Sequence, residues 1–306
     1  MNILVTGGAG FIASHVADAY IAAGHKVVIV DNLFMGSMKN VNKKAKFYRA
    51  DIRDAKMVSI LKKEKIDVVN HHAAQISVPD SVRDPVTDAQ INIMGTINMF
   101  EAARKSSVKK FIFVSSGGTV YGSNVKLPAV ENNPLTAESP YGIAKVTGEH
   151  YARFYTQQYG IKHTILRYSN VYGPRQIPHG EAGVVAIFIE KIMAGKAPVI
   201  FGGGTCVRDY VNVKDVARAS VLALKNGDNE AFNIGTGIKT DVNQLYAAIQ
   251  KATGFKEPAG KGPYRLGDLK ANYLVNKKAA KVLGWKPEVD LETGIQETYD
   301  YFKSLK

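Results

Sequence analysis

The feature that most constrains this chain is a glycine-rich turn between its first predicted strand and its first predicted helix. Residues 6–13 read TGGAGFIA, directly after the apolar run 2–6 and at the start of a helical pattern over 10–23. Glycines allow a tight turn and let backbone amides approach a pyrophosphate at a helix N-terminus, where partial positive charge favours an anion. The segment therefore predicts a dinucleotide-binding turn, with contacts from Gly7, Gly10, Phe11 and Ile12.

An aspartate at the end of the second predicted strand supports this interpretation. Asp31 follows the run 26–30, where its carboxylate is suited to accept hydrogen bonds from both ribose hydroxyls of an adenosine and to repel a 2′-phosphate. NAD is therefore favoured over NADP. The alternative is a loop shaped by glycines and an acidic turn residue. Asp51, with Ile52 beside it, is placed to reach the adenine amino group, unless it is an ordinary strand-end residue.

Short β-branched runs alternate with longer helical patterns up to residue 167. The predicted strands are 2–6, 26–30, 47–50, 67–70, 111–115 and 164–167. This alternation predicts a doubly wound, Rossmann-type parallel α/β sheet with right-handed crossovers. After residue 167 strand and helix patterns no longer alternate regularly, which indicates a smaller, irregular α/β domain. We expect helices at 184–193 and 215–224, a strand at 231–234 that returns to the main sheet, and helix caps at Thr240, Asn276 and Thr293.

Composition narrows the class of protein and of partner. The chain has 306 residues, 45% of them apolar, and a net charge of +13, which is the balance of a globular protein and not of a disordered one. Its single cysteine, Cys206, permits no intramolecular disulfide or cysteine-held metal site. We find no signal-peptide pattern and no membrane span, and expect a cytoplasmic protein. The lysine clusters lack interleaved aromatic residues, so we expect no nucleic acid and no membrane partner.

A tyrosine and a lysine stand four residues apart in a predicted helix that begins near Ser139 and Pro140. Tyr141 and Lys145 therefore share one helix face. A cation beside a phenol lowers its pKa from about 10 toward neutrality, so the phenolate can act as a base on a hydroxyl. By itself the pair indicates only a solvated helix face, but with the dinucleotide turn upstream it predicts a reaction site.

These segments resemble the extended short-chain dehydrogenase/reductase family, and within it the UDP-glucose 4-epimerases and other nucleotide-sugar 4-epimerases. The similar segments read TGGAGFIA, HHAAQ, SSGGTVYG, SPYGIAK, LRYSNVYGPRQ, VRDYVNVKD and LGW. The resemblance implies that Tyr141 removes the proton of the sugar 4-hydroxyl while hydride moves from C4 to tightly bound NAD. The 4-keto sugar then turns and the hydride returns to its other face, with Lys145 on the nicotinamide ribose. It also implies a homodimer.

The resemblance further assigns residues to the two ligands. Residues 1–167 with about 212–238 would hold NAD, and residues 168–211 and 239–306 would bind the UDP-hexose. Further cofactor contacts would come from Asn32, Leu33, Met35, Gly36, His72, Ala73, Ala74, Gln75, Ser115 and Ser169. Substrate contacts would come from Gly117, Tyr141, Asn170, Val184, Phe201, Arg208, Arg265, Asp268 and Asn272. Asn272 stands where a large Tyr would restrict the sugar 2-substituent, so we expect N-acetylated hexoses to be accepted as well. For either arginine the alternative is a surface ion pair, with Asp209 or Asp268.

One position departs from the family pattern. Gly117 stands where the family carries a third active-site Ser or Thr, so Ser116, Thr119 or a water must supply that hydroxyl. Gly118 and Thr119 replace the acidic residues of related dehydratases, which favours epimerisation over elimination. UDP-glucuronate epimerisation, another dehydratase or reductase activity, and a non-catalytic dinucleotide- or RNA-binding role remain the alternatives. His71 and His72 are strand neighbours pointing to opposite faces, so no metal is expected.

Overall fold

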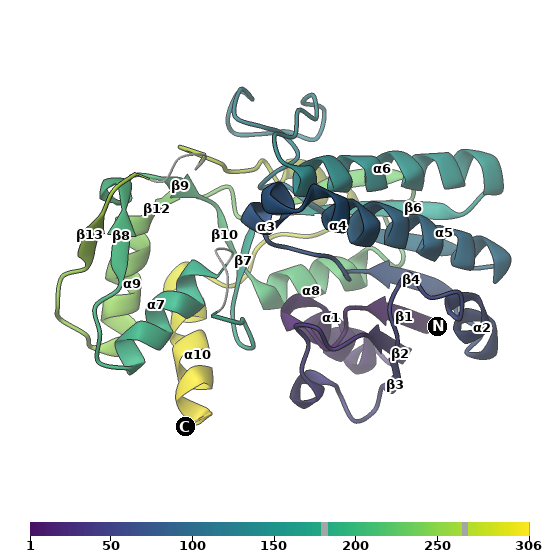
Figure 1. Cartoon of the computed structure of the whole chain (residues 1–306), viewed down its shortest axis with the longest axis horizontal. Helices are drawn as coiled ribbons and strands as arrows, with labels where there is room; N and C mark the ends of the chain where they lie inside the picture. Colours follow the sequence, from purple (N-terminus) through teal and green to yellow (C-terminus); the bar gives the residue numbers. More distant parts are fainter. Residues whose placement is uncertain (179–182, 265–268, 306) are drawn as a thin grey trace.

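A computed structural model of the chain describes residues 1–178, 183–264 and 269–305. Its centre is a parallel seven-stranded sheet in the order β11-β6-β5-β4-β1-β2-β3 (Figure 1). The strands are β1 (Asn2–Thr6), β2 (Lys26–Asp31), β3 (Lys46–Arg49), β4 (Val68–His71), β5 (Lys110–Ser116), β6 (Lys162–Tyr168) and β11 (Glu230–Ile234). The order reverses between β1 and β4, so the predicted doubly wound fold is confirmed. Ligands of such sheets bind at this switch point, beyond the carboxyl ends of the strands.

Helices cover both faces of the sheet because alternate strand residues point to opposite sides. One face carries α1 (Phe11–Ala22) and α8 (Val213–Leu222), which pack side by side over Ile3 and Val5. The other face carries α2 (Met57–Lys63), α5 (Gly95–Lys105) and α6 (Pro140–Tyr159), which pack over Leu4, Val28 and Val30. Two short helices, α3 (Val78–Arg83) and α4 (Pro85–Ala89), and a π-helical turn η2 (Gln90–Met94) lead into α5.

A smaller lobe lies beyond the carboxyl ends of the strands (Figure 1). Its helices α7 (Val184–Met193), α9 (Val242–Thr253) and α10 (Leu291–Ser304) share a core that includes Phe188, Leu245 and Ile295. Short strand pairs complete it: β7 (Asn170–Tyr172) with β10 (Tyr210–Asn212), β8 (Val199–Phe201) with β13 (Gly260–Gly262), and β9 (Val207–Arg208) with β12 (Thr240–Asp241). Single helical turns are η1 (Met38–Asn40), η3 (Gly202–Gly204) and η4 (Ala279–Leu283).

The last part of the chain returns to the large sheet. Trp285 is fully buried in the core formed by β1, α1 and α8, and its indole Nε1 donates to the Asp215 carbonyl at 2.8 Å. The Asp215 carboxylate in turn accepts the backbone N–H groups of Glu288 and Val289 at 3.0–3.1 Å. The core of the sheet is therefore completed by residues close to the C-terminus.

Most predicted elements are confirmed within two residues, including the return of residues 230–234 to the sheet beside β6. Two predicted caps are wrong. Asp241, not Thr240, caps α9 by accepting Gln244 N at 2.8 Å, and Asp290, not Thr293, caps α10 by accepting Thr293 N at 2.9 Å. A charged carboxylate accepts such bonds more strongly than a hydroxyl. No helix in the described ranges is long and apolar enough to cross a membrane.

Candidate active site

The glycine turn joins the ends of β1 and β4. Thr6 Oγ1 accepts the backbone N–H groups of His72 and Ala73, both at 3.1 Å. Gly7 has φ +70°, and a Cβ there would lie 3.0 Å from the Cα of Ala73. Gly10 occupies the N-cap position of α1 without a side chain over the helix end, so the first-turn amides face outward for an anion. The predicted phosphate turn is therefore formed by close backbone packing.

Asp31 is held in place at the end of β2. Its carboxylate accepts Ala9 N at 3.0 Å and Leu33 N at 2.7 Å, which leaves further lone pairs for a ligand. A Cβ on Gly36 would lie 2.9 Å from Asp31 Oδ1, so glycine lets this loop pass over the carboxylate. These residues fit the adenosine ribose of NAD. Asp51 is engaged by Arg53 at 2.8 Å and by Asn32 at 3.0 Å, and these bonds lower the pKa of its carboxyl to about 2.

The predicted reactive pair lies at the start of α6, beside the end of β5. Ser139 caps this helix by accepting Gly142 N at 3.1 Å, and Pro140 occupies the first turn. The Lys145 ammonium is buried, donates to the Val114 carbonyl at 3.1 Å and lies 5.5 Å from the centre of the Tyr141 ring. The four-residue spacing therefore places both groups together, as predicted.

Burial acts on the pKa of the phenol in the opposite direction to a neighbouring cation. Burial raises the pKa of Tyr141 above its ordinary value, and the charge of Asp88 raises it further, while a hydrogen bond from Ser116 lowers it. Burial also lowers the pKa of Lys145 to about 8. A low-dielectric site disfavours both the Tyr141 phenolate and the Lys145 ammonium. The four-residue spacing of the two residues does not show that they are buried.

The two hydroxyls proposed to replace the family Ser or Thr differ in their surroundings. The Ser116 hydroxyl lowers the pKa of the Tyr141 phenol, whereas the buried Thr119 Oγ1 has no partner among the described residues. Packing explains why position 117 carries glycine and not the family Ser or Thr, because a Cβ there would lie 2.5 Å from a methyl carbon of Leu274. Its effect on the Tyr141 pKa makes Ser116 our candidate for the third hydroxyl.

A buried ion pair fixes the reactive helix to the sheet. Glu149, two helical turns after Tyr141, accepts from Arg167 Nε at 2.8 Å and Nη2 at 2.6 Å, and from Ser115 Oγ at 2.7 Å. Glu149 is fully buried and Arg167 is 2% exposed. Because Arg167 belongs to β6 and Ser115 to β5, this cluster sets the position of α6 along both strands.

Three of the predicted substrate residues belong to elements of the small lobe, and a fourth, Arg208, lies in β9. Asn170 begins β7, Val184 begins α7, and Phe201 ends β8 opposite Gly262 of β13. Arg208 donates to the carbonyl groups of Val207 and Leu269 at 2.9 and 2.7 Å. Arg265 and Asp268 lie outside the described residues.

Two further side chains near the predicted substrate residues, Asp209 and Asn272, are buried. The buried Asp209 carboxylate accepts from Thr236, Gly237 and Leu274, which is not the surface ion pair considered for Arg208. Asn272 is buried and donates to the Gly117 carbonyl at 3.2 Å, while its Oδ1 has no partner among the described residues. Asn272 therefore joins the predicted substrate side to the loop after β5.

The remaining cofactor-side residues border the switch point. His71 bonds Thr6 and Thr96, whereas His72 contacts the Tyr168 hydroxyl at 3.3 Å, and burial lowers the pKa of both histidines to about 3. His72 Nδ1 and Ser169 Oγ are buried without a partner in the part of the chain described. Such orphaned polar atoms fit a site that receives a polar ligand. Three or more metal-ligating side chains do not gather anywhere in the described ranges.

Residues not predicted from the sequence also lie at the site. Asp88 accepts from Gln75, itself a predicted cofactor contact, at 2.8 Å, and Asn92 donates to the same carboxylate at 2.9 Å. Asp88 and Asn92 are one helical turn apart, a spacing too common to indicate function. Glu149 continues the four-residue spacing of Tyr141 and Lys145, which is a signal the sequence did contain.

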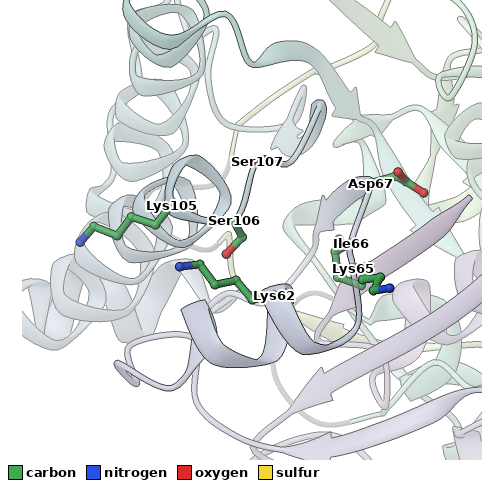
Figure 2. Close-up of a pocket in the computed structure, with 7 residues that line it drawn as sticks. All are labelled: Lys62, Lys65, Ile66, Asp67, Lys105, Ser106 and Ser107. Atoms are coloured by element: carbon green, nitrogen blue, oxygen red, sulfur yellow. The ribbon is translucent and has the colours of Figure 1, made fainter.

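A depression lies at the opposite end of the sheet strands from the candidate site. It has a volume of about 320 Å³, and Figure 2 shows its lining residues, Lys62, Lys65, Ile66, Asp67, Lys105, Ser106 and Ser107. These residues precede β4 and β5, at the amino ends of the strands. None of the predicted site residues lines it, so it does not belong to the candidate site.

Comparisons with known proteins agree with this geometry. Residues 3–235 match the NAD dependent epimerase/dehydratase family. The chain belongs to this family. Three solved structures are similar over the full chain, the first being a UDP-glucose 4-epimerase of Thermotoga maritima with UDP-glucose, which is 50% identical with TM-score 0.98 and full coverage of both chains.

The other two extend the range of ligands seen in the NAD dependent epimerase/dehydratase family. A Thermus thermophilus UDP-glucose 4-epimerase in complex with NAD is 41% identical with TM-score 0.94, and each chain is fully covered. A UDP-N-acetylglucosamine 4-epimerase of Methanobrevibacter ruminantium is 36% identical with TM-score 0.94, covering 100% of this chain and 99% of the other. The family assignment and the described Asp31 and Gly7 geometry agree on NAD as cofactor.

Proposed function

We propose that this chain is a UDP-glucose 4-epimerase that interconverts UDP-glucose and UDP-galactose with tightly bound NAD. The observation that carries the proposal is the grouping of Tyr141, Lys145 and Ser116 at the carboxyl ends of the strands, on the same edge of the sheet as the glycine turn. The likeness to the Thermotoga enzyme over the full chain supports the same substrate class.

In this mechanism the residues of the chain bind the sugar and move one proton. Bound beside the glycine turn and Lys145, NAD would supply the reversible hydride acceptor that the reaction at C4 of the sugar needs. Tyr141 removes the proton of the 4-hydroxyl, and Ser116, which lowers the pKa of the phenol, helps to stabilise the phenolate. Tyr141 returns this proton once the 4-keto sugar has presented its other face, so C4 is inverted without net oxidation.

Lys145 supplies the positive charge of the site. Its ammonium uses one donor on the Val114 carbonyl and keeps two for the nicotinamide ribose. Because burial and the charge of Asp88 raise the pKa of Tyr141, the phenolate needs positive charge beside it, and Lys145 provides part of this. The loop after β5 carries Gly118 and Thr119 where elimination would need carboxylates, which supports epimerisation.

We propose that the two ligands bind to different parts of the chain, as the sequence predicts. Residues 1–167 with about 212–238 bind NAD, and residues 168–211 and 239–306 bind the UDP-hexose. Arg208, together with Arg265, is suited to the diphosphate because a guanidinium donates two parallel bonds. Asn170, Val184, Phe201 and Asp268 complete the proposed nucleotide contacts.

N-acetylated hexoses are a second proposed substrate class. Asn272 is smaller than the Tyr that would restrict this position, and its unpartnered Oδ1 is suited to accept an acetamido N–H. The similarity to a UDP-N-acetylglucosamine 4-epimerase supports this extension. Comparing turnover on UDP-galactose and on UDP-N-acetylgalactosamine tests it directly.

A homodimer and a cytoplasmic location are part of the proposal. Phe154 and Tyr159 on α6 are 42% and 48% exposed, whereas Tyr155 is buried against Phe100 with a ring separation of 4.9 Å. Met94 of the preceding π-turn is 58% exposed. Exposed aromatic side chains of this size are typical of helix faces that pair. Sedimentation of the wild type and of Phe154→Glu distinguishes a dimer from a monomer.

The activity test needs no added cofactor. Purified protein is incubated with UDP-galactose and the products are followed by NMR, with Tyr141→Phe as control. Formation of UDP-glucose without net NADH is expected, together with loss of at least a hundredfold in rate for the variant. No reaction with UDP-galactose or any other UDP-hexose would refute the proposed function.

A further inference from the structure

A buried carboxylate outside the predicted site belongs to a helix that packs against α6, which carries the reactive pair. Asp88, on the last turn of α4, is 2% exposed. Its Oδ1 accepts from Gln75 Nε2 at 2.8 Å and from Asn92 Nδ2 at 2.9 Å. Both donors are neutral amides, so they orient the carboxylate without cancelling its charge.

The two amides are themselves tied together. Gln75 N donates to Asn92 Oδ1 and Asn92 Nδ2 donates to the Gln75 carbonyl, both at 2.9 Å. Gln75 follows β4 and Asn92 lies in the π-helical turn, so the cluster links the sheet edge to the helix that carries Asp88. A closed network of this kind restricts the carboxylate to one position.

The charged groups around α4 come from its neighbouring elements. On α3, Asp80 and Arg83 pair with each other at the surface at 2.5 Å. On α6, which packs against α4, Lys145 is the cation whose field reaches Asp88 and Tyr141 is the acid. Burial raises the pKa of Asp88, the two amides lower it, and Lys145 lowers it further, which is the sign expected of an ion pair acting through space.

We propose that Asp88 is the fixed counter-charge of the reaction site, a positioning residue that keeps Lys145 protonated and sets how readily Tyr141 gives up its proton. This inference rests on the proposed epimerase function. Burial opposes the Lys145 ammonium, whereas the Asp88 charge and the hydrogen bond to the Val114 carbonyl favour it. Asp88 thus holds the site in the charge state in which Lys145 can bind a ribose and assist the phenolate.

A second consequence concerns the oxidised cofactor. A site that holds the Lys145 ammonium and also accepts a positively charged nicotinamide carries two like charges. A buried negative charge at Asp88 reduces this repulsion and therefore favours the oxidised over the reduced form. Removing the charge should shift the bound cofactor toward NADH.

The first test is the pH profile of epimerisation for Asp88→Asn, which preserves the acceptor for Gln75 and Asn92. Loss of the negative charge lowers the pKa of both Tyr141 and Lys145, so both limbs of the profile should move down by about one pH unit. The control is Asp84→Asn, which removes an exposed carboxylate from the N-cap of the same helix. Asp84→Asn should leave the profile in place.

The second test does not depend on turnover. The holoenzyme is equilibrated with a redox dye, and the near-ultraviolet absorbance of reduced nicotinamide gives the ratio of bound NADH to NAD. Asp88→Asn should raise this ratio about tenfold at equal potential, and Asp88→Glu, which keeps the charge, should restore most of the wild-type value. Asp88→Ser provides the same comparison if the asparagine variant does not fold.

The outcomes separate the inference from the proposed function. If Asp88→Asn lowers the rate of epimerisation without moving the pH profile or the ratio of bound NADH to NAD, Asp88 serves only in packing and the inference is overturned. A wild type without epimerase activity would instead refute the proposed function, while the redox ratio would still test Asp88.

Discussion

Restoring the family hydroxyl at position 117 should destabilise this protein instead of improving it. A Cβ on Gly117 would lie 2.5 Å and 3.2 Å from the two methyl carbons of Leu274 and 3.3 Å from the Arg167 carbonyl oxygen. Carbon atoms in contact are normally about 3.5–4.0 Å apart, and Leu274 is fully buried. Overpacking of this size costs about 1–3 kcal/mol. We therefore expect Gly117→Ser to lower the free energy of unfolding by that amount.

The assay is chemical unfolding of a double-mutant cycle. Leu274→Ala alone should cost about 2–5 kcal/mol, but in the Gly117→Ser background it should cost less, because the serine occupies the vacated space, with a coupling of about 1–3 kcal/mol. Gly118→Ser is the matched control, since a Cβ there meets only Ser116 Oγ at 3.7 Å. A stable Gly117→Ser variant, or a cycle without coupling, would refute the packing explanation for this glycine.

Three further results are expected. In a urea titration, Glu149→Gln should lower the free energy of unfolding by about 3–5 kcal/mol, because it leaves the Arg167 charge buried without its partner. As a control, replacing the exposed Glu292 should lower it by less than about 1 kcal/mol. Stability should fall as the pH drops below about 6.5, because the unfolded chain protonates His71 and His72 while the folded chain, with both pKa values about 3, does not. At pH 5 each histidine should account for about 2 kcal/mol, and unfolding midpoints that do not change between pH 7 and pH 5 would contradict this. Asn272→Tyr should reduce turnover of the N-acetylated hexose far more than that of UDP-galactose, and equal losses on both substrates would argue against a specificity role.

Local chemistry explains what could be predicted. The glycine turn, Asp31 and the Tyr141–Lys145 spacing each act within one strand-turn-helix unit, so their roles follow from neighbours in the sequence. The caps at Thr240 and Thr293 were wrong because an adjacent or nearby aspartate competes for the same helix end. Choosing the stronger acceptor in each case would have placed both caps correctly.

The remaining features depend on residues far apart in the chain. The reason for Gly117 lies in Leu274, and the raised pKa of Tyr141 comes from burial that no local pattern reports. Asp88 reaches the site only because α4 packs against α6. A buried charge is invisible in a sequence until its surroundings are known, since the same residue type on a helix of this length is usually exposed.

The position of Trp285 has a consequence for the order in which the protein matures. The strands of the sheet are made first, but the indole that fills the space between β1, α1 and α8 belongs to the last tenth of the chain. During synthesis, the apolar space that Trp285 fills therefore stays empty until the C-terminal segment has been made. Shortening the chain from its C-terminal end by two dozen residues would leave that gap permanently open, with the residues of the reaction site still present but their support incomplete.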